Sequence, residues 1–295
     1  MRSMDLAYYQ KLFNLKSYTK VAAFFKVSQP TVTAAVQRLE EELDAQLLIR
    51  DQSHHALIFT ESGIQFQRHA ETVLRTLNTA KKEIQAIQSE KVRFGFPPII
   101  GGYYFPPFSD YLVQIGKLSA LRIEEDGSQS LLDKLLKGYL DLALIASLQP
   151  IADEDSHLTV LPLACHKFRV IVGRQHALAA EQAINFQALR KECFVQFNEH
   201  FIHPQAFKQF CAHSHIRPKV LYHLNDLQMI KGMVARNIAV SLLAEPAIHA
   251  GDPIVALPLS DQDQPMFHVS FVYRSTHVLT DLQQQMVSWF SDAGR

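Results

Sequence analysis

Apolar residues recur at helical spacing within the first 50 residues of the chain. Four of them, separated by four, three and four positions, form one stripe that a helix would bury: Val32, Val36, Leu39 and Leu43. A shorter apolar face ends at Phe25, and Lys26 and Val27 then form a turn. Ser28 begins the second helix, because its hydroxyl can accept a hydrogen bond from a first-turn amide, and Pro30 needs no N–H there. Two helices joined by so short a turn predict a helix-turn-helix.

The face of the second helix opposite this stripe is polar. Side chains of this kind reach base edges and phosphates when a helix lies in the major groove of DNA. We therefore expect contacts with double-stranded DNA from Lys26, Ser28, Gln29, Pro30, Thr31, Thr33, Gln37 and Arg38. The chain has 29 basic and 29 acidic residues, so its formal net charge is zero. Between Leu6 and Leu39, however, every charged residue is basic, which leaves a local positive face for phosphates.

The residues of this segment resemble the DNA-binding end of LysR-type transcriptional regulators. The family pattern combines an aromatic residue, small residues, a central Ser-Gln-Pro, a hydroxyl and a Leu-Glu pair, which are here Tyr18, Ala22-Ala23, Ser28-Gln29-Pro30, Thr33 and Leu39-Glu40. The match continues into a wing and the start of a further helix at Leu47, Arg50, Thr60 and Gly63. Asp44 and Leu48 depart from the usual Gly and Phe. Because Asp tolerates a left-handed backbone, we expect the turn into the wing to be kept.

The resemblance implies a winged helix-turn-helix in residues 1–62. Arg50 in the wing and His54 at its tip are then candidates for phosphate contacts, although His54 could equally be a solvated turn residue. Within the family, residues 27–40 and 50–63 are most similar to regulators of malolactic fermentation. That similarity suggests a small organic acid, such as malate, as the effector.

Residues 63–90 predict one long helix. Seven apolar residues recur at alternating spacings of four and three: Phe66, Ala70, Val73, Leu77, Ala80, Ile84 and Ile87. Such a seam either packs on the helix's own domain or pairs with a second copy. Its place between a DNA-binding unit and a larger domain favours a dimerising linker, and the family resemblance implies two such helices paired antiparallel. A homodimer or homotetramer would then read two half-sites.

From Lys91 onward, short apolar strands alternate with helices. Candidate strands occupy residues 92–96, 121–127, 140–146, 168–173, 193–197, 219–224, 237–245 and 268–274. Candidate helices occupy residues 105–116, 130–138, 204–211 and 226–235. This order predicts an α/β domain over residues 91–295, with parallel sheets covered on both faces.

Residues 133–145 resemble the effector domain of the same regulators, which has two lobes like the periplasmic solute-binding proteins. The resemblance implies lobe I at about residues 91–164 and 267–295, and lobe II at about residues 165–266.

A small-molecule effector of such a fold would lie between the lobes, at loops beyond the carboxyl ends of the strands. The candidates on these loops are Pro98, Ile99, Ile100, Gly101, Ser128, Gln129, Ser130, Gln196, Asn198 and His200. The loop at residues 97–102 leads from the first strand into a helix, whose free first-turn amides form an anion site. Many relatives have a hydroxyl near Ile99 to hold a carboxylate, so backbone amides or Ser128 and Ser130 would have to replace it. The alternative is that these residues are ordinary loop caps and turns.

The sequence argues against a membrane or exported protein, a metalloprotein and an enzyme. No apolar run approaches the roughly 20 residues of a membrane helix, and Asp5 and Lys11 stand where a signal peptide is apolar, so we expect a cytoplasmic protein. The three cysteines and the histidines lack zinc-type spacing, so no metal and no cofactor are expected. Phosphate-binding loops and nucleophile motifs are missing, which argues against an enzyme. A solute-binding protein or enzyme built on the two-lobed domain is the alternative, but it leaves residues 1–90 without a purpose.

Overall fold

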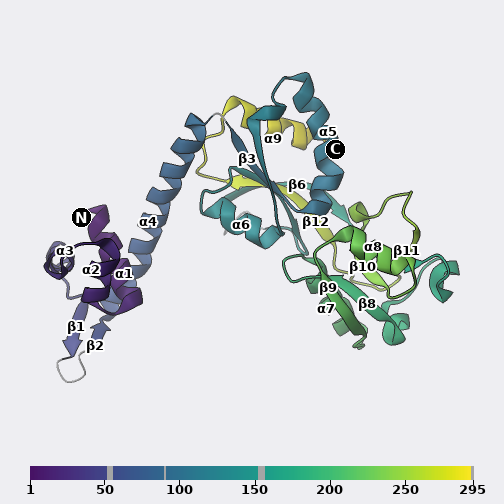
Figure 1. The fold of residues 1–295 in the computed structure, drawn as a ribbon, viewed down its shortest axis with the longest axis horizontal. Coiled ribbons are helices and arrows are strands. Elements are labelled where there is room, and N and C mark those ends of the chain that lie inside the picture. Colours follow the sequence, from purple (N-terminus) through teal and green to yellow (C-terminus); the bar gives the residue numbers. More distant parts are fainter. Residues whose placement is uncertain (52–55, 90, 152–156, 294–295) are drawn as a thin grey trace. The chain divides into compact units, whose positions relative to one another are not determined.

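The computed structural model describes residues 1–51, 56–89, 91–151 and 157–293. The chain divides into two compact units, residues 1–84 and 85–295 (Figure 1). Each unit has a hydrophobic core of its own.

The first unit contains a bundle of three short helices, a two-stranded wing and most of a longer fourth helix. The helices are α1 (Ser3–Leu15), α2 (Tyr18–Phe25) and α3 (Gln29–Leu43). The antiparallel strands of the wing are β1 (Leu48–Asp51) and β2 (Ala56–Phe59), and α4 (Glu61–Gln88) follows them. Leu12, Val21 and Leu39 are fully buried where the three helices meet. The predicted winged helix-turn-helix is confirmed.

The buried stripe of α3 is shorter than predicted. Val32, Val36 and Leu39 are at most 1% exposed, whereas Leu43 is 37% exposed. Leu43 is the last residue of α3, and the next residue, Asp44, has a left-handed backbone with φ 46°. The chain therefore leaves the helix direction before Leu43 can pack, so the prediction for Leu43 is wrong. The prediction that Asp44 keeps the turn into the wing is confirmed.

Lobe I of the second unit is built on a five-stranded sheet with the order β4-β3-β5-β12-β6. Its strands are β3 (Val92–Phe96), β4 (Leu121–Glu125), β5 (Leu142–Ser147), β6 (Leu158–His166) and β12 (Phe267–Arg274). Its helices are α5 (Pro98–Gln114), η1 (Leu118–Ala120), α6 (Ser128–Leu136) and α9 (Asp281–Ala293). Phe108 of α5 and Phe290 of α9 pack together against Phe94 of β3, while Leu131 of α6 packs with Ala143 in a separate cluster. Helices thus cover both faces of the sheet, as expected for an α/β domain.

Lobe II contains two smaller sheets. In one, β7 (Phe168–Gly173) lies between β10 (Ser241–Ala244) and β11 (Ile254–Pro258), and in the other β8 (Cys193–Phe197) lies beside β9 (Lys219–Leu224). The helices are η2 (Ala177–Ala180), η3 (Phe186–Lys191), α7 (His203–His213), α8 (Leu227–Ala235) and η4 (Glu245–Ala247). A bridge between Phe194 and Val240 connects the two sheets.

The sheets are mixed, which corrects the expectation of parallel sheets. β3 is parallel to β4 and β5, and β8 is parallel to β9. β12 is antiparallel to β5 and β6, and β7 is antiparallel to β10 and β11. The antiparallel pairs arise because β6 continues directly into β7, and β12 brings the chain back to lobe I. The α/β class itself is confirmed.

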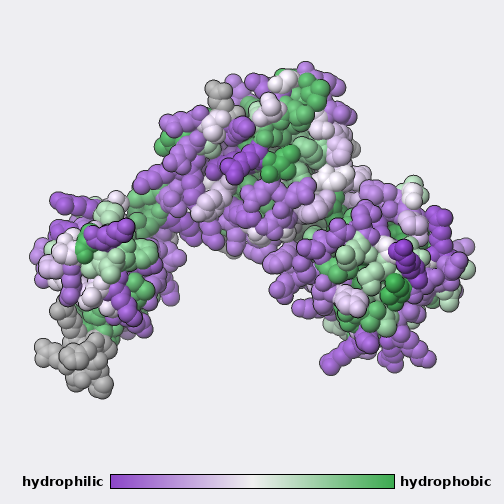
Figure 2. Space-filling model, in the orientation of Figure 1, coloured by the Kyte–Doolittle hydropathy of each residue, from purple (hydrophilic) through white to green (hydrophobic). Residues whose placement is uncertain are grey.

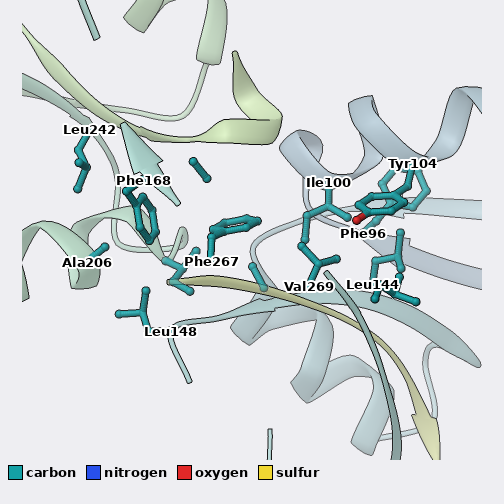
Figure 3. Close-up of a cluster of buried hydrophobic side chains, with 14 of the residues drawn as sticks. Phe96, Ile100, Tyr104, Leu144, Leu148, Phe168, Ala206, Leu242, Phe267 and Val269 are labelled. Carbon is teal, nitrogen blue, oxygen red and sulfur yellow. The ribbon is translucent and has the colours of Figure 1, made fainter. Parts of the chain in front are cut away.

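One cluster of buried side chains extends across both lobes. Figure 3 shows Phe96, Ile100 and Val269 on the lobe I side of this cluster and Phe168 and Phe267 farther toward lobe II. The rings of Phe168 and Phe267 meet edge to face with centroids 5.9 Å apart. The strands that connect the lobes are therefore packed in a continuous core.

Candidate nucleic-acid interface and effector site

Two serine caps and one left-handed residue set the geometry of the helix-turn-helix. Ser17 accepts a hydrogen bond from the Lys20 amide at the start of α2, and Ser28 accepts one from the Thr31 amide at the start of α3. Between the helices, Lys26 has φ 56°, so α2 ends abruptly. The turn and the cap that the sequence predicted are both confirmed.

The exposed face of α3 carries a shallow depression. It is lined by Gln29, Pro30, Thr33, Ala34 and Gln37, which belong to two successive turns on one side of the helix. Ala34 was not among the predicted contacts, because a small apolar residue on a polar face gives no signal of its own. Its methyl group is suited to contact a thymine methyl in the major groove.

The side chain of Gln29 is oriented by α2. The Thr19 hydroxyl donates to Gln29 Oε1 at 3.3 Å. One lone pair of that oxygen and both amide hydrogens remain available, which is the set that a bidentate contact with adenine uses. The Thr33 hydroxyl donates to the Gln29 carbonyl at 3.2 Å and keeps its acceptor sites. Thr19 is thus a positioning residue that the sequence pattern did not reveal.

The predicted cations differ in whether they already form an ion pair within the protein. Lys26 is exposed and has no ion pair among the described residues. Arg38 instead donates from Nη2 to Asp5 Oδ1 at 2.6 Å and from Nε to Asp5 Oδ2 at 3.3 Å. Asp5 is only 3% exposed, so this pair joins α1 to α3. Arg38 would have to share or leave Asp5 in order to reach a phosphate.

The remaining predicted DNA contacts lie on the first turn of α3 and in the wing. Ser28 and Thr31 are exposed, and their hydroxyl oxygens are 2.8 Å apart. The backbone of Arg50 lies in β1, and His54 lies outside the described residues.

The two lobes of the second unit touch at two places that involve predicted effector residues. The carbonyl oxygen of His200 lies so close to Gly127 that a Cβ atom on Gly127 would be 1.9 Å from it. Residues 98–101 were predicted to lie on a loop, but α5 already begins at Pro98, because Pro98 and the apolar residues after it start the helix directly. Ile99, in the first turn of α5, is 4% exposed and packs in the core of lobe II with Ile171 and Leu243. Ile99 is therefore a contact between the lobes, while Ile100 lies in the core shared by both.

Several predicted effector residues have hydrogen-bond partners inside the protein. The Ser128 hydroxyl accepts from the Ala146 amide at 2.9 Å, and the Ser130 hydroxyl donates to Asp126 at 2.5 Å. Asn198 Oδ1 accepts from the His200 amide at 3.1 Å. These are the contacts of loop caps, which was the alternative interpretation of the sequence. Of the other candidates, Pro98 and Gln129 are exposed, and Gly101 packs against the Phe96 ring.

Several buried side chains of lobe II carry polar atoms without a hydrogen-bond partner among the described residues, and Gln196 and His203 are two of them. Gln196 is 4% exposed, and its Nε2 has no hydrogen-bond partner among the described residues. His203 is 3% exposed, and its Nε2 accepts from the Ala244 amide at 3.3 Å. Its proton must then be on Nδ1, which also has no partner in the described part of the chain. Burial lowers the pKa of His203 to about 3, so the ring is neutral.

His203 was not among the predicted effector residues. Its ring lies among Phe168, Phe197 and Phe267, close to the strands that connect the lobes. The sequence places it in a stretch rich in histidines, where nothing marks it as the buried one.

Comparison with known proteins decides the family. The family profile described as the bacterial regulatory helix-turn-helix protein of the lysR family matches residues 4–64. The profile described as the LysR substrate binding domain matches residues 85–295. The chain belongs to the LysR family of transcriptional regulators. It is a DNA-binding regulator with an effector-binding domain, and not an enzyme.

Relatives resemble this LysR-family chain from end to end. It is 31% identical to the malolactic fermentation system transcriptional activator of Lactococcus lactis subsp. lactis (strain IL1403), over 96% of each chain. It is 26% identical to the DNA-binding transcriptional dual regulator OxyR of Escherichia coli (strain K12), over 97% of this chain and 93% of OxyR. The structure of a full-length OxyR variant from Pseudomonas aeruginosa matches with a TM-score of 0.56 and 25% identity, covering 100% of this chain and 95% of that one.

The apolar seam of α4 divides into two parts in this regulator. Phe66 and Ala70 pack in the core of the first unit. Farther along, Val73, Leu77 and Ile84 are 45%, 43% and 57% exposed in the single chain, and Ala80 and Ile87 are exposed as well. Figure 2 shows part of α4 as hydrophobic surface. The exposed part of the seam is thus available to a second copy.

Neither a membrane-spanning helix nor a metal-binding cluster occurs in the part of the chain that the structure describes. Across residues 1–51, 56–89, 91–151 and 157–293, no helix is both long and apolar enough to cross a membrane. The same residues hold no group of three or more His, Cys, Asp or Glu side chains that could bind a metal ion.

Proposed function

We propose that this LysR-family regulator binds operator DNA with the exposed face of α3, and that a small organic acid controls this binding from a site between its two lobes. The observation that carries the first part is the depression on α3. Amide, hydroxyl and methyl groups gather there on one helix face, at Gln29, Thr33, Ala34 and Gln37. These are the groups that distinguish base pairs in the major groove.

Phosphate contacts would come from exposed cations around this face. Lys20 and Lys26 are exposed on or beside α2, and neither has an ion pair among the described residues. We expect each of them to contribute affinity for any DNA sequence. Arg38 would contribute to a smaller extent, because Asp5 already holds its guanidinium.

We further propose that the protein acts as a homodimer or a homotetramer, paired through α4. The support is the exposed apolar seam at Val73, Leu77, Ala80, Ile84 and Ile87. Burying an exposed Leu or Ile side chain stabilises an assembly by roughly 1.5–3 kcal/mol. Two copies would present two α3 helices to two half-sites of one operator.

The effector proposal rests on two buried hydrogen-bond donors in lobe II. Gln196 and His203 each hold an unpartnered N–H donor in lobe II. A carboxylate offers only acceptors, so an organic acid matches donors of this kind. The relative named as an activator of a malolactic fermentation system makes malate the first effector to test.

Fluorescence anisotropy with labelled DNA from the region flanking the coding sequence tests this function. We expect saturable binding to one segment that is at least tenfold tighter than binding to a shuffled segment of the same composition. Malate should change the dissociation constant by about 5- to 150-fold, the usual range of coupling between two sites. Equal affinity for operator and shuffled DNA would contradict the readout proposal. If malate leaves the dissociation constant unchanged and another organic acid alters it, malate is not the effector, while the proposed control by an organic acid stands.

A further inference from the structure

Lobe II has an open groove that neither the DNA-binding proposal nor the effector proposal uses. It lies between η3, α7 and the loop that leads into β9, and its volume is about 790 Å³. Its lining is largely apolar, with Phe207, Ile216 and Pro218 among the contributing residues. Small-molecule sites in proteins typically enclose roughly 300–1,000 Å³ and have mostly apolar walls. The groove therefore has the size and character of a ligand site.

The walls of the groove are held firmly. Phe186 of η3 stacks on Phe210 of α7 with ring centroids 5.0 Å apart, and Phe207 packs against Phe194 of β8 at 4.8 Å. Where α7 ends, His215 has a left-handed backbone with φ 51°. This residue turns the chain back along the helix, so that the loop before β9 forms the second wall. Rotation of the exposed side chains is then the main freedom that a ligand would have to fix.

Three cations surround the apolar lining. Arg190 comes from η3, Lys208 from α7 and Arg217 from the loop before β9. None of the three forms an ion pair with a residue in the described part of the chain. The groove lining includes no acidic residue. A nearby carboxylate, Asp261, accepts hydrogen bonds from the Phe186 amide at 2.8 Å and the Ser214 hydroxyl at 3.4 Å.

We propose that this groove binds an amphiphilic carboxylate, a molecule with a hydrocarbon body and one anionic end. The body would cover Cys211, Ala212 and Pro218, which are partly or fully exposed, and remove their apolar surface from water. Phe207 and Ile216 are only 7% and 3% exposed and form the floor of the groove. The carboxylate would lie among Arg190, Lys208 and Arg217, where guanidinium groups can bind it through two parallel hydrogen bonds. Neither a neutral apolar molecule nor a small hydrophilic anion uses both parts of this site. The site is separate from the one proposed for the organic-acid effector.

Isothermal titration calorimetry of the full-length protein with decanoate tests the proposal. Decanol, which has the same body without the charge, and acetate, which has the charge without the body, are the matched ligands. The double variant Lys208→Ala with Arg217→Ala removes two cations, and Ala212→Trp fills the groove from the exposed face of α7. Lys117→Ala removes an exposed cation of lobe I and is the control variant.

We expect one decanoate to bind per chain, with decanol and acetate at least tenfold weaker. The double variant should weaken decanoate binding about tenfold, since each exposed charge pair supplies a factor of up to roughly five. Ala212→Trp should abolish binding, and Lys117→Ala should leave it unchanged. Equal binding of decanol and decanoate, or equal binding by the double variant, would overturn the proposal. The proposal would also be overturned if the wild type did not bind decanoate and the Ala212→Trp variant had an altered sedimentation coefficient. The groove would then be a contact between copies of the chain.

Discussion

The contact between Gly127 and His200 makes the closeness of the two lobes testable with a single methyl group. A Cβ on residue 127 would lie 1.9 Å from the His200 carbonyl oxygen, 2.8 Å from its carbonyl carbon and 3.2 Å from its Cβ. Ordinary C···O contacts begin at about 3.3 Å, so Gly127→Ala requires the two loops to part by roughly 1.4 Å. Gly127 has φ −68° and ψ 150°, which alanine adopts without strain. Any effect of this variant therefore comes from the contact between the lobes.

The magnitude of that effect follows from overpacking, which typically costs about 1–3 kcal/mol. If the lobes stay together, a unit of this size should lose about 2–10 °C in melting temperature. If the effector holds the lobes together, the same cost should weaken effector binding by about 5- to 150-fold. Affinity for operator DNA without effector should not change, because Gly127 belongs to the second unit and α3 to the first.

Differential scanning calorimetry and anisotropy titrations with malate provide the two readings. Gly102→Ala is the matched control, since Gly102 lies within α5 and nothing is within 4 Å of its added methyl group. Alanine should stabilise that helix by about 0.5–1 kcal/mol. If Gly127→Ala melts like the wild type and responds to malate at wild-type concentrations, the lobes do not meet at this contact and the reasoning is refuted.

Three other predictions concern single side chains. Leu77→Glu places a charge in the exposed seam of α4, so analytical ultracentrifugation should detect a smaller species, and an unchanged oligomer would remove α4 as the main contact. Tyr9→Phe removes the hydroxyl that donates to the Gly63 carbonyl at 3.0 Å, which should lower the unfolding free energy by about 1–2 kcal/mol in urea titrations; no loss would mean that the bond does not form. Below about pH 6.5 the unfolded state protonates His203, whereas the folded state does so only at about pH 3, so the free energy of unfolding decreases as the pH is lowered through this window. His203→Gln should remove up to about 1.4 kcal/mol per pH unit of that decrease, and parallel pH profiles of variant and wild type would refute the burial of a neutral ring.

The helix-turn-helix could be predicted from sequence because its signals are local. Ser28, Pro30 and Asp44 each act within a few residues of their own position, and the structure confirms the turn and cap that they indicate. Helix α1 was not predicted, although Tyr9 and Leu12 are fully buried in it. The residue before it, Arg2, is the N-cap and makes no capping hydrogen bond through its side chain, so the sequence has no capping signal there.

Strand directions in the second unit could not be predicted from the pattern of apolar residues. An apolar run such as that of β12 has the same appearance in a parallel or an antiparallel pair. Its direction follows from the path of the chain, because Phe267 begins a strand that returns from lobe II and pairs antiparallel with β5 and β6. Strands β6 and β11 were also missed, and β11 ends in a proline, Pro258.

The candidate functional residues also divide into those that local sequence patterns could place and those that depend on tertiary contacts. Gln29 and Thr33 could be placed on an exposed face from helical spacing alone. The pairing of Arg38 with Asp5 joins residues 33 positions apart, and the burial of Ile99 in the core of lobe II joins two lobes. Such contacts depend on tertiary packing, which single-sequence patterns do not contain. The same holds for His203, whose burial separates it from its exposed neighbours.

The central claim is that the exposed face of α3 reads base edges while nearby cations bind the backbone. Its most direct test is the ratio of dissociation constants for shuffled and operator DNA, measured by anisotropy over a range of salt concentrations for Gln29→Ala and Lys26→Ala. Gln29→Ala should reduce the ratio by about 5- to 150-fold, equivalent to 1–3 kcal/mol, and leave binding to shuffled DNA nearly unchanged. Lys26→Ala should weaken both complexes equally and lower the salt slope by roughly one unit. An equal loss on both DNAs for Gln29→Ala would contradict the account.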